Sequence, residues 1–216
     1  MQEYLQPTEF LDFDQAAVRA YAERAAQKGV DDVTRAVQLY YAVRDDFAYD
    51  PYLLDLRREG LRASTLLQKT RGYCVEKAVL LAAVARAVGI PSRLSFYIVQ
   101  NHIATGKIER ILRTNKLVFH GAAEMFLQGH WVKATPAFNR SLCIRLGVAP
   151  LEFDGVNDAI FQQYDNAGHT FMDYLHDYGN FPDLPYHLYL SELQKHYPHL
   201  MDDAQRQRVE LVYDLN

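Results

Sequence analysis

The stretch that decides the fold is GYCVEKAVLLAAVARAVGIPSR, residues 72–93. Within it, apolar side chains recur at helical spacing and therefore share one face: Cys74, Ala78, Leu81, Ala82, Ala85 and Val88. Gly89 and Pro91 follow directly, and a glycine followed by a proline is typical of the end of a helix. The sequence predicts a helix from Cys74 to Val88 with one buried face.

Two more helices are predicted upstream of this stretch. Residues 12–26 form the first, and a second begins near Asp31 or Asp32. Apolar residues of the second helix lie at helical spacing as far as Phe47, which indicates one buried face. Pro51 marks its limit, because the residue before a proline is pushed out of the helical region.

Three strands are predicted downstream. Residues 93–99, 117–127 and 130–135 are rich in β-branched and aromatic side chains, and Gln128-Gly129 is a hairpin turn between the last two. The polar residues 101–114 are expected to be a loop. Helices followed by antiparallel strands predict an α+β fold, in which the helix that starts at Cys74 packs on the sheet.

The chain changes character beyond Asn139, where aspartates alternate with phenylalanine and tyrosine. We interpret residues 1–145 as the core and residues 146–216 as a C-terminal extension packed on it. A helix is expected to end the chain from about Asp202.

Composition excludes several classes of protein. Apolar residues make up 49% and charged residues 23% of the chain, which is typical of a globular domain rather than a disordered chain or a coiled coil. The net charge of -4 argues against nucleic acid as a partner, because phosphate binding needs a basic surface. Neither a secretory signal nor an apolar run of about 18 residues is seen, so we expect a cytoplasmic location and no membrane partner.

The sequence predicts neither a cofactor nor a metal. It contains no phosphate-binding glycine loop and no dinucleotide-binding motif. Its two cysteines cannot form a disulfide framework or a four-thiolate zinc site, so both are expected to be reduced. His169, Asp173 and His176 would align on a helix as metal ligands do, but a tyrosine-rich helical face is the more common meaning of such a pattern.

Cys74 is the candidate nucleophile. A thiol at a helix N-terminus lies at the positive end of the dipole and near unpaired backbone N–H groups, which favour the thiolate and lower the pKa. The same N–H groups could bind an oxyanion that develops on a substrate carbonyl. The alternative is a buried cysteine that acts only as a small apolar side chain. Cys143 has no neighbouring motif and is interpreted as structural.

His120 is the candidate base. Strand alternation places it on one face with Val118, Ala122 and Glu124. The hairpin register pairs Glu124 with Lys133 and Ala122 with Thr135, so Thr135 shares the face of His120. Asn139 shares it as well if the strand continues past Pro136. Either residue could orient the imidazole, while the alternative is a half-buried histidine with a structural role.

Taken together, these segments resemble the transglutaminase-like superfamily. Gly72-Tyr73-Cys74 and Gly89-Ile90-Pro91-Ser92-Arg93 are similar to the start and end of that family's nucleophile helix. Residues 120–126 are similar to its histidine strand, and residues 131–136 to the next strand, which normally ends in Asp-Pro. The resemblance covers roughly residues 12–140.

The resemblance implies a papain-like Cys-His-Asp triad with Cys74 as nucleophile and His120 as base. This sequence departs from the pattern, because Thr135 occupies the position of the aspartate. A threonine can orient a neutral imidazole but supplies no charge to stabilise an imidazolium. Asn139 or Asp154 could take over the role, or activity could be reduced or lost.

Two functions follow from these residues. The first is cysteine-dependent amide hydrolysis or acyl transfer on a peptide or protein substrate. The second is a catalytically inactive module whose groove, lined by tyrosine and phenylalanine, binds a peptide or a partner protein. The sequence decides neither hydrolysis against transfer nor the oligomeric state.

Overall fold

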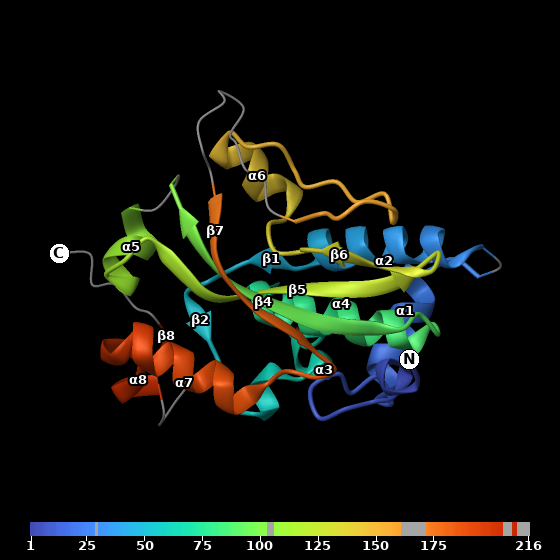
Figure 1. Cartoon of the computed structure of the whole chain (residues 1–216), viewed down its shortest axis with the longest axis horizontal. Helices are drawn as coiled ribbons and strands as arrows, with labels where there is room; N and C mark the ends of the chain where they lie inside the picture. The colour runs from blue at the N-terminus through green and yellow to red at the C-terminus, as the bar shows by residue number, and fades with distance from the viewer. Residues whose placement is uncertain (29, 103–105, 161–171, 205–208, 211–216) are drawn as a thin grey trace.

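The protein combines helices with a four-stranded antiparallel sheet, which confirms the α+β prediction (Figure 1). The computed structural model describes residues 1–28, 30–102, 106–160, 172–204 and 209–210. Within these ranges, no helix combines the length and the apolarity that crossing a bilayer would require.

Helix α4 (Cys74–Ala87) is the centre of the fold, as its sequence predicts. Helices α1 (Ala16–Ala25), α2 (Asp32–Asp46) and α3 (Ala63–Leu66) contact it, and strands of the sheet cover it as well. Its residues from Val75 to Arg86 are therefore all buried, not only those of one face.

The main sheet has the strand order β6-β5-β4-β7. Strands β4 (Ser92–Asn101), β5 (Lys116–Leu127) and β6 (His130–Ala134) confirm the three predicted strands. The predicted hairpin register is also confirmed, because Glu124 pairs with Lys133 and Leu127 with His130.

Strand β7 (Met172–Phe181) pairs with β4 and corrects the expectation of a helical face around Asp173 and His176. Most of its side chains are partly or fully exposed, so it lacks the apolar signal of a central strand. His169 lies outside the described residues. The boundary at residue 145 stays a prediction, but residues beyond it extend the core sheet.

Two further expectations were wrong. Residues 101–114 are not only a loop, because α5 (Gly106–Leu112) buries Ile108, Ile111 and Leu112, whose spacing is helical. The C-terminal part contains α7 (Tyr186–His196) and α8 (Pro198–Ala204), so no helix begins at Asp202. The short strand β8 (Val209–Glu210) follows and pairs with β2 (Leu53–Leu54).

The remaining elements are short. They are η1 (Gln2–Leu5), η2 (Glu59–Leu61), α6 (Arg140–Leu146) and the parallel pair β1 (Ala48–Tyr49) and β3 (Arg71–Gly72). The pairing of Tyr49 with Gly72 is important for the site, because it fixes the chain that leaves α2 beside the start of α4.

Lys77 joins three parts of the fold from inside the core. Its side chain is fully buried, and Nζ donates hydrogen bonds to the carbonyl oxygens of Arg44, Phe47 and Ala137 at 2.8 to 2.9 Å. Arg44 lies in the last turn of α2, where carbonyls have no partner within the helix. Burial lowers the pKa of Lys77 to about 7.

We expect Lys77→Met to lower the free energy of unfolding by about 2 kcal/mol or more, because three buried carbonyls lose their donor. The folded-state pKa near 7 lies below the ordinary value of 10.5, so the unfolded chain binds the extra proton between these pH values. The stability of the wild type relative to the variant should therefore rise as the pH increases from 7 to 10. Urea unfolding at several pH values measures it, and a difference that is small and independent of pH would contradict this role.

Candidate active site

The start of α4 and the middle of β5 meet at Gly121. A Cβ atom on this residue would lie 3.2 Å from the Cα of Val75 and 3.3 Å from the Cβ of Ala78. A glycine inside a strand often marks such a close backbone approach. The residues that precede Gly121 and Val75 in the chain are His120 and Cys74, and both line the same pocket.

Cys74 lies at the N-terminus of α4, as predicted. Glu76 accepts a hydrogen bond from the backbone N–H of Tyr73 at 3.1 Å, which caps the helix start. The backbone N–H groups of Gly121, Val75 and Cys74 itself lower the pKa of the Cys74 thiol, but burial outweighs them and raises that pKa to about 11. The expectation of a lowered pKa was therefore wrong, because desolvation of the thiolate exceeds the effect of the helix terminus.

His120 is completely buried, and a bulge in β5 positions it. The register between β4 and β5 shifts just before His120, and Phe119 has a φ of +60°. Bulges redirect side chains and are frequent beside active sites. The buried apolar side chains form two clusters: a first cluster around α4 and a second, smaller cluster that includes Ala122 and Cys143. Because of the bulge, Val118 packs in the first cluster and Ala122 in the second. Val118 therefore does not share one face of β5 with Ala122, although strand alternation predicts that it does.

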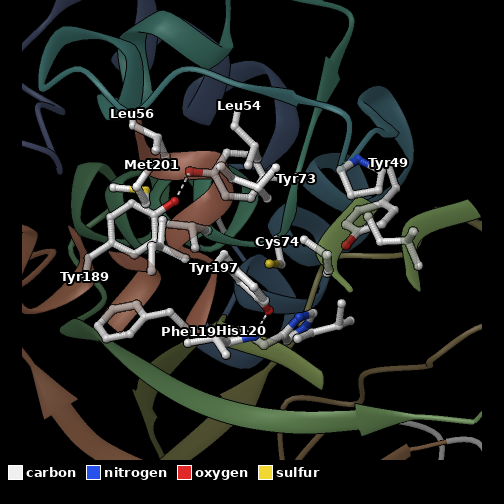
Figure 2. A pocket seen from close by; sticks show the side chains of 18 residues that line it. Tyr49, Leu54, Leu56, Tyr73, Cys74, Phe119, His120, Tyr189, Tyr197 and Met201 are labelled. Carbon is white, nitrogen blue, oxygen red and sulfur yellow. Dashed lines mark hydrogen bonds between the residues drawn. The ribbon is translucent and has the colours of Figure 1, made fainter. Parts of the chain in front are cut away.

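Both candidate residues line one pocket, where Figure 2 shows them with Tyr197 close by. Burial lowers the pKa of His120 to about 3. At neutral pH the site therefore holds a neutral thiol and a neutral imidazole rather than a thiolate–imidazolium pair.

Thr135 follows directly after β6 and is buried, and its hydroxyl has no hydrogen-bond partner among the described residues. The Asn139 side chain accepts a hydrogen bond from the Tyr49 N–H at 2.9 Å and donates one to Ser141 at 2.7 Å. Asn139 thus holds Tyr49, a pocket residue, against the start of α6. That either residue orients His120 stays a prediction.

Asp154 has a different environment. Its carboxylate accepts hydrogen bonds from the N–H groups of Val156 and Asn157 and from the Asn157 side chain, and these lower its pKa. The next residue, Gly155, packs against Val33 in the N-terminal half of α2. The pocket residue Tyr49 instead follows the C-terminal end of α2. Asp154 is thus fixed in a turn of its own.

Cys143 is buried in the second apolar cluster, in agreement with a structural role. In the part of the chain that the structure describes, no group of three His, Cys, Asp or Glu side chains is arranged to hold a metal ion.

Sequence reasoning missed several residues that shape the site. Gly121 carried a usable signal, since a glycine beside a candidate base in a strand suggests close packing. Lys77 carried a weaker signal, a cation within an apolar helix. Tyr189 and Tyr197, which reach the pocket from the C-terminal segment, carried none.

The protonation states give a direct prediction for thiol reactivity. The rate of Cys74 alkylation by iodoacetamide should keep rising through pH 9 without an inflection near pH 6. Thr135→Asp should place a carboxylate near His120, raise the pKa of the imidazole and lower the pKa of the Cys74 thiol by about 1 unit or more.

Mass spectrometry of the Cys74 peptide across pH 5 to 11 measures these rates, with the Cys143 peptide as an internal reference. Thr135→Asn is the matched control, because it adds a polar group of similar size without charge. A wild-type inflection below pH 8, or an unchanged profile in Thr135→Asp, would contradict the account of the site.

Comparison with known proteins identifies the family. A family model described as the transglutaminase-like superfamily matches residues 19–136, more than half of the chain. No curated protein matches the sequence.

Two solved structures are similar. One is described as a "putative cysteine protease" from Cytophaga hutchinsonii, with 16% identity and a TM-score of 0.49 over 82% of this chain and 52% of that chain. The other is described as a "putative protease" from Parabacteroides distasonis, with 15% identity and a TM-score of 0.39 over 59% of this chain and 26% of that chain. The present chain spans about half the length of the first.

Proposed function

Because the chain belongs to the transglutaminase-like superfamily, we propose that it hydrolyses a peptide or protein amide, or transfers its acyl group, through Cys74 and His120. One observation carries the proposal. The thiol at the start of α4 and the imidazole on β5 line the same pocket.

The neutral state of both groups defines the first step. Cys74 Sγ attacks the amide carbonyl while its proton passes to His120, so that the S–C bond forms without a stable thiolate beforehand. Backbone N–H groups at the start of α4, where they have no partner within the helix, would donate to the oxyanion. The proton then passes from His120 to the leaving amine as the C–N bond breaks.

The product of this step is a thioester on Cys74. Water attacks the thioester carbonyl in hydrolysis, or an amine attacks it in acyl transfer, and the S–C bond breaks. Neutral His120 accepts the proton of the nucleophile and returns it to the Cys74 sulfur as the sulfur leaves. Thr135 supplies no negative charge to stabilise the imidazolium that exists while His120 carries the transferred proton. We therefore expect slower turnover than in a site with an aspartate at this position.

A specific observation favours the second candidate, an inactive module that binds a peptide or partner protein. Burial moves the pKa of Cys74 up and that of His120 down, which opposes formation of an ion pair. An inactive member would keep the pocket and the binding surface without forming a thioester.

Incubation with peptide para-nitroanilides separates the two candidates. The enzyme should release nitroaniline and form a thioester on Cys74, seen as the added acyl mass, and hydroxylamine should convert this intermediate to a hydroxamate. Cys74→Ala should abolish the reaction and His120→Gln should slow it by about 100-fold or more.

Cys143→Ser is the matched control, because it changes the other thiol and should leave the rate unchanged. Equal product release by the wild type and Cys74→Ala, with no added mass, would support the inactive module.

A further inference from the structure

The pocket beside Cys74 is almost entirely apolar. It is a hollow that is partly open to solvent. Besides Cys74 and His120, its described walls consist of aliphatic and aromatic residues: Tyr49, Pro51, Leu54, Leu56, Tyr73, Val75, Ile108, Leu112, Leu117, Val118, Phe119, Tyr189, Leu193, Tyr197, Leu200 and Met201. None of these described wall residues is Lys, Arg, Asp or Glu.

The tyrosine hydroxyls in the walls are largely engaged with the protein itself. The hydroxyls of Tyr73 and Tyr189 form a hydrogen bond with each other at 2.8 Å (Figure 2). The Tyr197 hydroxyl donates to the carbonyl of Lys116 at 2.7 Å and accepts from the N–H of Val118 at 2.8 Å. These three hydroxyls therefore already have partners within the protein.

We propose that this pocket selects an apolar acyl group, an aliphatic chain or an aliphatic or aromatic side chain, whose carbonyl carbon reaches Cys74. The inference rests on the proposed function and names its acyl donor. A carboxamide or a charged group in the same space would lose its hydration and find few free polar partners, and an unpaired polar group costs several kcal/mol in an apolar site. The side chain of glutamine is therefore a poor fit.

A first experiment measures binding without chemistry. Straight-chain alcohols from butanol to octanol should protect Cys74 from iodoacetamide. The concentration for half protection should fall by about fourfold for each methylene group that enters the pocket. Propionamide, which resembles the end of a glutamine side chain, should protect at least about tenfold more weakly than butanol.

Variants of the pocket wall provide the control for nonspecific effects. Leu54 and Leu200 line the pocket and are only partly buried, so a lysine at either position can be accommodated by the fold. Leu54→Lys and Leu200→Lys should each reduce protection by octanol about tenfold or more. Leu175→Lys is the matched control, because Leu175 is 46% exposed on β7 and is not a wall residue.

A second experiment follows acyl transfer to the thiol. With para-nitrophenyl esters, Cys74 forms the S–C bond, nitrophenolate leaves, and the thiol proton passes through His120 to solvent. Acylation should be faster for hexanoate than for acetate, and faster for the ester of N-acetyl-leucine than for that of N-acetyl-glutamine. Comparing hexanoate and decanoate with N-acetyl-leucine and N-acetyl-phenylalanine distinguishes a fatty chain from an amino-acid side chain.

The two experiments separate the inference from the proposed function. Protection that increases with chain length and is lost in the lysine variants supports the apolar pocket even if no ester is turned over. Acylation that is fastest with acetate or with the glutamine ester, or protection that is independent of chain length, would overturn the inference while leaving Cys74 catalysis intact.

Discussion

The close contact between Gly121 and the first turn of α4 is the constraint on which the site depends. A Cβ atom here would lie 3.2 to 3.3 Å from atoms of Val75 and Ala78, which is tighter than an ordinary van der Waals contact. A side chain at this position would require the strand or the helix to shift by a few tenths of an ångström. His120 and Cys74 adjoin this contact in the chain and line the same pocket. The contact at Gly121 thus sets the spacing between the strand and the helix that carry the two groups required by the proposed chemistry.

Burial, the consequence of this tight packing, determines the charge of the site. It raises the pKa of Cys74 and lowers the pKa of His120, although backbone N–H groups favour the thiolate. The walls that exclude water come largely from the C-terminal segment, through Tyr189, Tyr197 and Met201. The core supplies the reactive groups, and α7, α8 and the residue between them supply much of the apolar surface that surrounds the substrate.

Features that follow from the local spacing of residues could be predicted from the sequence. Features that depend on atoms from many distant segments could not. The helix from Cys74 and the hairpin register at Glu124 and Lys133 follow from local spacing, so both were predicted correctly. The raised pKa of Cys74 depends on how many atoms from distant segments cover the thiol, which spacing does not reveal. The bulge at Phe119 and the edge strand β7 also escaped prediction, because neither changes the apolar period in a recognisable way.

The central claim, that Cys74 and His120 form one thiol–imidazole site, can be tested by bridging the two side chains. The reagent 1,3-dibromoacetone first alkylates a thiol and can then alkylate a second nucleophile within about 5 Å, close to the separation expected of a nucleophile and its base. After proteolysis, mass spectrometry should find the peptide that contains Cys74 joined to the peptide that contains His120, and His120→Gln should abolish this product. Cys74 alkylated at one end only, or joined to a different residue with His120 unmodified, would contradict the account.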